Sequence, residues 1–131
     1  MSETAAADCG VGDRGIVRVE WIKCKGGTWC NLLDVDLDSN HFKGCFGVYI
    51  IWQLGGEVVI VGQGEIGERV ALHRSDPEVV RYGEDKRLCV TWTRLEPKDA
   101  DGVEAYVRRA YCPIQRDGPP SAQPVFVNLP W

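Results

Sequence analysis

Two apolar runs separated by a pair of glycines place the strongest constraint on how this chain can fold. The first run, GVYIIWQL at 47–54, is rich in β-branched and aromatic side chains, which favour a strand. Gly55 and Gly56 predict a turn, after which EVVIVG at 57–62 returns as the partner strand. The sequence therefore predicts a β-hairpin near its middle.

The hydrophobic period changes from strand to helix after this hairpin. From Glu65 onward, Ile66, Val70 and His73 recur on one helical face. A second, short helix is expected in SDPEVVRYG, where Asp76 is the N-cap, Pro77 takes the first helical position and Gly83 ends the helix. Two helices thus follow the hairpin directly.

A further strand and a longer helix complete the predicted order. RLCVTWTRL at 87–95 is typical of a strand, and Asp99 or Asp101 can cap a helix through GVEAYVRRAY. The apolar side of that helix is expected to comprise Val103, Val107, Ala110 and Tyr111.

The two ends of the chain give weaker patterns. Residues 1–15 are small and polar and predict a disordered tail, and 16–24 alternates like a strand or extended segment. In 27–39, helical and irregular packing compete. The proline-rich end, 112–131, predicts an extended arm over the surface. With 131 residues there is room for one domain.

The start of the chain and its apolar runs predict a cytosolic protein. The first residues lack a basic segment and an apolar core, and no apolar run is long enough to span a membrane. The six cysteines are therefore expected to be reduced, since disulfides are rare in the cytosol. Zinc is the alternative, but no C-x-x-C occurs and five residues separate Cys24 from Cys30. Cys89 and Cys112 are expected to be small core residues.

The charge distribution leaves nucleic-acid binding open. A net charge of −4 argues against a strong non-specific binder. Ten of the 15 Lys and Arg residues nevertheless lie beyond residue 64, so either a local basic groove or a mixed, solvated surface is compatible with the pattern. These cations are Arg69, Arg74, Arg81, Lys86, Arg87, Arg94, Lys98, Arg108, Arg109 and Arg116.

Gly62, Gly64 and Gly67 form a G-x-G-x-x-G that could hold a dinucleotide pyrophosphate. That site needs a βαβ unit and an acidic residue after the next parallel strand, a position that Glu96 could take. Two features oppose it: the glycine-bearing strand is already paired in a hairpin, and only 35 residues follow Glu96. We expect the glycines to serve other chemistry.

Another set of residues resembles the GIY-YIG nuclease domain. Gly47-Val48-Tyr49 is followed after ten residues by Ile60-Val61-Gly62, with Arg69 seven residues and His73 eleven residues further on. Glu104 lies on the later predicted helix, and Asn128 follows Pro124. The resemblance covers about 46–131, with 16–45 as an N-terminal extension packed on the domain. It implies an α/β (α+β) fold, a small, mostly antiparallel sheet of about three strands flanked by helices.

The resemblance also implies a role for each motif residue. Tyr49 would deprotonate or position the attacking water, with His73 matching a histidine of the homing branch. Arg69 would neutralise the phosphate, a task suited to a permanently charged planar group. Glu104 would bind Mg²⁺ or Mn²⁺, and Gly62 and Asn128 would contact substrate. The implied function is a metal-dependent endonuclease acting on DNA, with a partner protein as one source of sequence specificity.

One position departs from the family pattern. Ile60 stands where the family usually has a second tyrosine, and its side chain cannot form hydrogen bonds. An alternative therefore stays open, in which the chain is a catalytically inactive member of this fold that binds nucleic acid or a protein partner.

Overall fold

The computed structural model describes residues 17–115 and 123–131, so the predicted tail at 1–15 lies outside the described residues. Its centre is an antiparallel sheet of four strands in the order β1-β4-β2-β3. The strands are β1 (Cys30–Asn31), β2 (Phe46–Gln53), β3 (Val58–Glu65) and β4 (Leu88–Arg94). The mixed α/β class is confirmed, whereas the expected count of about three strands is wrong. The additional strand, β1, has two residues and is too short to produce a periodic sequence pattern.

The predicted hairpin is present as β2 and β3. Tyr49 pairs with Gly62 and Gly47 with Gly64, and the register shifts between Ile51 and Trp52. Strand β3 continues through both glycines to Glu65. Gly62 and Gly64 are therefore both strand residues, and the strand extends beyond the predicted end at Gly62.

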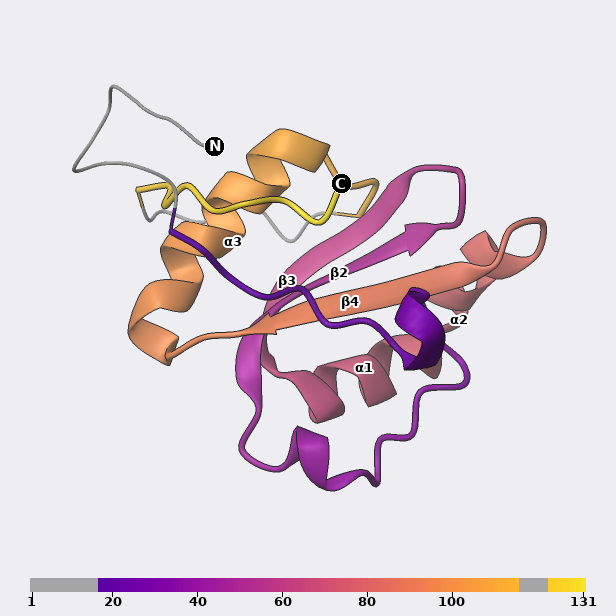
Figure 1. Cartoon of the computed structure of the whole chain (residues 1–131). Coiled ribbons are helices and arrows are strands. Elements are labelled where there is room, and N and C mark those ends of the chain that lie inside the picture. The colour runs from indigo at the N-terminus through magenta and orange to yellow at the C-terminus, as the bar shows by residue number, and fades with distance from the viewer. Residues whose placement is uncertain (1–16, 116–122) are drawn as a thin grey trace.

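Helices cover both faces of the sheet (Figure 1). On one face, Ile66 and Val70 of α1 (Ile66–Arg74) are buried in a cluster with Tyr49 and Trp92. On the other face, α3 (Pro97–Tyr111) buries Ala100, Val103 and Val107 against the opposite sides of β2, β3 and β4. Side chains alternate between faces along a strand, so each central strand contributes to both clusters.

The long helix α3 begins earlier than expected. Glu96 is its N-cap and Pro97 its first residue, where a proline is favoured because its missing N–H needs no partner. The expected caps at Asp99 or Asp101 are therefore wrong. At the other end, Ala110 and Cys112 are exposed, so the expectation that they are buried is wrong. Cys112 adopts a left-handed conformation (φ 48°) and is the C-cap of the helix.

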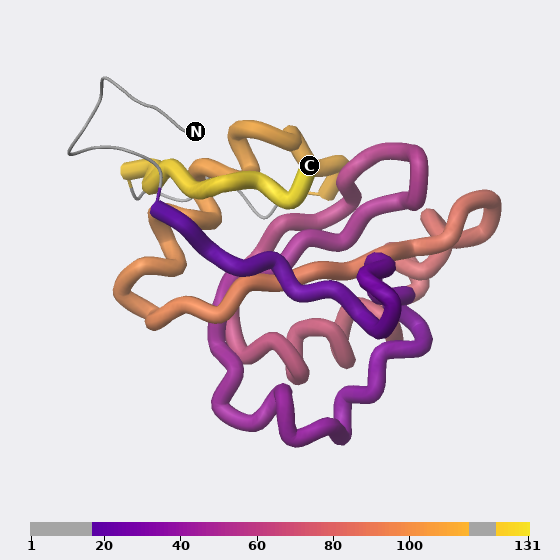
Figure 2. Tube along the Cα trace, in the orientation of Figure 1, coloured from indigo at the N-terminus to yellow at the C-terminus, as the bar shows by residue number. Residues whose placement is uncertain are grey.

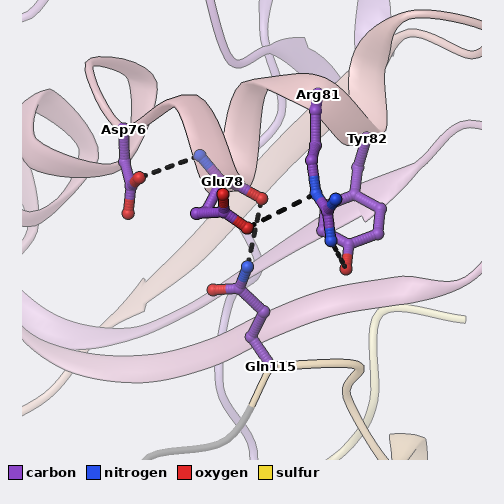
Figure 3. Close-up of polar contacts among 5 residues, drawn as sticks. All are labelled: Asp76, Glu78, Arg81, Tyr82 and Gln115. Carbon is purple, nitrogen blue, oxygen red and sulfur yellow. Dashed lines mark hydrogen bonds and ion pairs between the residues drawn. The ribbon is translucent and has the colours of Figure 1, made fainter.

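The short helix α2 (Pro77–Val80) forms as predicted (Figure 3). The Asp76 carboxylate accepts a hydrogen bond from the Glu78 amide at 2.9 Å, which makes it an N-cap. A 3₁₀ turn, Arg81–Gly83, follows directly. Gln115, beyond α3, donates to the Glu78 carbonyl at 3.1 Å and so attaches the chain after α3 to this helix.

The segment that opens the described chain runs beside the final one on the α3 side of the sheet (Figure 2). Val17 and Val127 form a parallel β-bridge. Further along, the Trp21 indole donates to the Asn128 carbonyl at 2.6 Å. The expected extended arm is thus partly buried, since Val127 is only 1% exposed.

The remainder of the extension crosses to the α1 side. Cys24 and Cys30 form a disulfide there, so the expectation that these two cysteines are reduced is wrong in this structure. A 3₁₀ turn, Lys25–Gly27, folds the chain back and brings their Cα atoms to 5.1 Å. Arg74 of α1 donates to the Val35 carbonyl at 2.8 Å and holds the later part of the extension. In the part of the chain that the structure describes, no helix has the length and apolar character needed to span a membrane.

Candidate functional site

The segment Gly62–Gln63–Gly64 of β3 is where the predicted site residues meet. Strand β3 is one of the two edge strands of the described sheet, and these three residues are half-buried. Because side chains alternate along a strand, the two glycines face the α1 side while Gln63 faces α3. Side chains from both helices therefore reach the same short stretch of backbone.

Tyr49 covers Gly62. The two residues are cross-strand partners, and a Cβ added at Gly62 would lie 2.6 Å from Tyr49 Cζ, well inside contact distance. The tyrosine oxygen lies 2.7 Å from His73 Nε2, within hydrogen-bond distance. Glycine at 62 thus provides the space in which a buried tyrosine reaches across to α1.

Arg69 covers Gly64 in the same way. A Cβ at Gly64 would lie 3.0 Å from Arg69 Cγ and 3.1 Å from Cδ. Gly64 also has φ +142°, a conformation that residues with a side chain rarely adopt. Both glycines of the G-x-G therefore make room for a predicted site residue, Tyr49 at the first and Arg69 at the second.

Glu104 reaches the segment from the α3 side. Its Oε1 accepts a hydrogen bond of 2.7 Å from the side-chain amide nitrogen of Gln63. Its Oε2 lies 3.7 Å from Arg108 Nε. Glu104 is 9% exposed, so its carboxylate is largely shielded from solvent. A carboxylate in such a place needs polar partners, which Gln63 and Arg108 supply.

Ile60 lies two residues before Gly62, on the same face of β3. It is 8% exposed and belongs to the apolar cluster that includes Tyr49. This position therefore contributes apolar packing beside the tyrosine, where the family usually has a second phenol.

Asn128 lies in a different setting from the other predicted residues. Its side-chain oxygen accepts from the Val19 amide at 2.7 Å, and its side-chain nitrogen donates to the Val19 carbonyl at 2.9 Å. Both ends of the amide are thus used to hold the N-terminal segment. This reciprocal pair is a strong structural reason for asparagine at 128.

The sequence reasoning missed Gln63 and Asp101. The Gln63 amide nitrogen, already bonded to Glu104, also donates to Asp101 Oδ1 at 2.5 Å. Asp101 and Glu104 are three residues apart on α3, a spacing that places them on one helical face. That spacing was visible in the sequence, but nothing in it indicated that a residue between two glycines would join the carboxylates.

Two carboxylates, Asp101 and Glu104, lie at this edge of the sheet. Asp101 and Glu104 provide carboxylate oxygens, and Mg²⁺ typically binds through one or two carboxylates, several waters and substrate phosphate. No group of three or more His, Cys, Asp or Glu side chains able to hold a metal occurs within 17–115 and 123–131. The oxygens of Asp101 and Glu104 that face each other both accept hydrogen bonds from the Gln63 side-chain nitrogen.

Several of the cations considered for a basic groove bind groups of the protein. Arg74 donates to the Val35 carbonyl, and Arg94 donates to the His41 carbonyl at 2.9 Å. The Arg81 guanidinium lies over the Tyr82 ring, 5.0 Å from its centroid. Arg74 and Arg94 thus link segments far apart in the chain, whereas Arg81 contacts the adjacent Tyr82. Arg69 is the cation that lies against the glycine segment.

The extension adds a concave surface near this site. A cavity of about 490 Å³ lies between the extension and β4, with Trp29, His41, Phe42 and Trp92 in its lining. Trp92 is the cross-strand partner of Tyr49, and its indole donates to His41 Nε2 at 3.0 Å. The cavity thus adjoins the buried tyrosine through Trp92.

The glycine motif departs from the geometry of a dinucleotide site. Such a site places its glycines in the turn between a parallel strand and a helix. Here β3 pairs antiparallel with β2, and the space above Gly62 and Gly64 is filled by Tyr49 and Arg69.

Comparisons with protein-family models, with curated proteins and with solved structures gave no match to this chain. The resemblance to GIY-YIG nucleases rests on the motif residues of the sequence.

Proposed function

We propose that this chain is a divalent-metal-dependent endonuclease of the GIY-YIG type that hydrolyses DNA phosphodiester bonds. The observation that carries the proposal is the convergence of Tyr49, Arg69 and Glu104 on 62–64, with His73 hydrogen-bonded to Tyr49. Phosphodiester hydrolysis needs an activated water, a cation beside the phosphate and stabilisation of developing charge. The four side chains provide groups suited to each requirement.

In the proposed reaction, Nδ1 of His73 accepts the proton of the attacking water. In the tautomer that this requires, Nε2–H of His73 donates to the Tyr49 oxygen, an arrangement in which a second group orients a general base. Arg69 neutralises charge on the phosphate. Glu104 would hold Mg²⁺ or Mn²⁺, which when bound would supply stabilisation of the charge that builds on the phosphate oxygens.

Tyr49 and His73 differ in exposure to solvent, and this difference distinguishes their proposed roles. Tyr49 is 1% exposed, whereas His73 is half-buried. A group must come within hydrogen-bond reach of the proton that it removes. We therefore assign the contact with water to His73 and the orientation of His73 to Tyr49.

Ile60 favours a second candidate function. Its apolar side chain fills the position of the second tyrosine, and the chain has a net charge of −4. In this alternative, the fold binds nucleic acid or a partner protein without cleavage. Binding to DNA with a steep inverse salt dependence, and no cleavage at any Mg²⁺ concentration, would favour this alternative.

The test is nicking of supercoiled plasmid in Mg²⁺ by wild type and by Glu104→Ala, with an EDTA control. We expect nicking by wild type alone, because the variant lacks the proposed metal ligand. Glu57→Ala is the matched control, since it removes an exposed glutamate from the hairpin turn. Equal nicking by wild type and Glu104→Ala would exclude the proposed role of Glu104.

A further inference from the structure

Three tryptophans from distant parts of the chain meet on the α3 side of the sheet. The ring centroid of Trp131 lies 4.5 Å from that of Trp52, near the end of β2. Trp29, which precedes β1, meets the Trp52 ring edge-on at 5.3 Å and the Trp131 ring at 6.0 Å. We call these three residues the tryptophan cluster.

The tryptophan cluster has a buried base and an open outer side. Trp52 is 5% exposed, whereas Trp131 is 50% exposed and Trp29 is half-buried. An indole that is fixed by neighbouring rings and is still open to solvent provides a rigid aromatic surface. Other rings stack on such a surface at little cost in conformational entropy.

The chain around the tryptophan cluster is cationic, although the net charge of the whole chain is −4. Lys23 Nζ lies over the Trp29 ring, 4.5 Å from its centroid, in a cation–π contact. The segments that surround the cluster, 21–33, 46–54, 105–115 and 123–131, contain no Asp or Glu in their sequences. Their cations are Lys23, Lys25, Arg108 and Arg109, of which Arg108 pairs with Glu104.

This combination favours one kind of partner. Surfaces that bind single-stranded nucleic acid combine cations, which follow the phosphates, with aromatic side chains on which bases stack. An apolar peptide would use the rings but would gain nothing from the cations. The charge around the exposed indole is therefore complementary to a polyanion that carries planar bases.

The tryptophan cluster lies on the same side of α3 as the candidate site. The Tyr111 ring packs against Trp131, with 4.8 Å between the ring centroids. Glu104 precedes Tyr111 by seven residues on this helix, a spacing that places both on one helical face. Seven residues correspond to about 10 Å along the helix axis. A DNA strand at the candidate site therefore needs to continue only two helical turns to reach Trp131.

From these observations we infer that the tryptophan cluster binds unpaired nucleotides of the DNA substrate. A base stacks on Trp131, and the exposed Lys23 and Lys25 lie beside the phosphates. Bases in a duplex are already stacked on their neighbours, so this surface selects a single strand. The inference rests on the proposed function, which it deepens by naming the substrate class as DNA with a single-stranded segment.

The test is fluorescence anisotropy of a labelled oligothymidylate at low salt in EDTA, which reports binding without cleavage. Trp131→Ala should weaken binding about tenfold or more, the usual effect of removing one ring on which a base stacks. Trp131→Phe should keep most of the affinity, because a phenyl ring also stacks. Leu72→Ala is the matched control, since it removes another exposed apolar side chain, from α1, and should bind like wild type.

The two lysines are tested through the salt dependence of binding. Lys23→Gln and Lys25→Gln should each reduce the slope of log affinity against log salt by about 0.7, the value for one phosphate of a single strand. Lys43→Gln is the control, because it removes an exposed lysine elsewhere in the extension and should leave the slope unchanged. Far-UV circular dichroism of each variant separates loss of binding from loss of fold.

The possible results separate this inference from the proposed function. The inference is wrong if wild type does not bind the single strand, or if Trp131→Ala binds it like Leu72→Ala. It is also wrong if wild type sediments as a dimer that Trp131→Ala dissociates, because the cluster then joins two copies of the chain. If wild type binds the single strand through Trp131 but does not nick plasmid, the proposed cleavage fails and this inference stands.

Discussion

The phenol oxygen of Tyr49 lies 2.7 Å from Nε2 of His73, so a strand residue orients the ring of a helix residue 24 positions later in the chain. The tyrosine is 1% exposed and its ring lies over Gly62. The orientation of the histidine therefore depends on a buried contact between β2, β3 and α1, and this dependence can be tested by substitution.

Tyr49→Phe removes the hydroxyl and keeps the ring. We expect the free energy of unfolding to fall by about 1 kcal/mol, the usual net contribution of one hydrogen bond. Plasmid nicking should fall further, toward the roughly 10²-fold loss typical of removing a general base, because His73 is no longer oriented. Tyr111→Phe is the control, since it also removes one tyrosine hydrogen bond, of 2.8 Å to the Trp131 carbonyl. Equal nicking by the two variants would contradict the role of Tyr49.

Gly62→Ala places a methyl group in the space that the Tyr49 ring occupies. The added carbon would lie 2.6 Å from Tyr49 Cζ, so the ring must move, and we expect a destabilisation of about 1–3 kcal/mol with loss of nicking. Gly67→Ala is the comparison, because its added carbon would lie 3.3 Å from Phe42 Cβ and alanine favours a helix. Urea unfolding measures the stability of both variants. If Gly62→Ala is as stable as Gly67→Ala, the Tyr49 ring can accommodate the added methyl group.

Reduction should destabilise the protein through the Cys24–Cys30 disulfide. The bond closes a loop with a sequence separation of 6, for which loop entropy predicts about 2 kcal/mol. Urea unfolding with and without dithiothreitol should show this difference for wild type and for Cys112→Ser, which leaves the pair intact. Cys24→Ser should be insensitive to the reductant. A wild type equally stable in both conditions would argue that the two thiols are not bonded in solution.

Asn128→Ala distinguishes a structural asparagine from one that binds substrate. It removes two hydrogen bonds to Val19, and we expect a loss of about 1–3 kcal/mol in the free energy of unfolding. Asn128→Asp should also destabilise, because a carboxylate cannot donate to the Val19 carbonyl. DNA affinity from fluorescence anisotropy should be unaffected in a folded variant. Weaker DNA binding at unchanged stability would instead support the substrate role, with the exposed Asn40→Ala as control.

The local sequence determined the elements whose signals are short-range. The hairpin turn at Gly55–Gly56, the Asp76 cap and the change of period at Glu65 each depend on residues a few positions apart. Their strands and helices formed where the pattern predicted them. The start of α3 was misplaced because Pro97 at the first helical position outweighed two later aspartates as possible caps.

Only the tertiary structure brings together residues that lie far apart in the chain. The sequence places Tyr49, Arg69 and Glu104 far apart, and only the pairing of β2 with β3 and the packing of α1 and α3 bring them to 62–64. The same holds for Asn128, whose partner Val19 is 109 residues away, and for Gln63, whose carboxylate partners lie on α3. Periodicity reports which face of an element is buried. It does not report which partner that face meets, because long-range partners are set by how the elements pack.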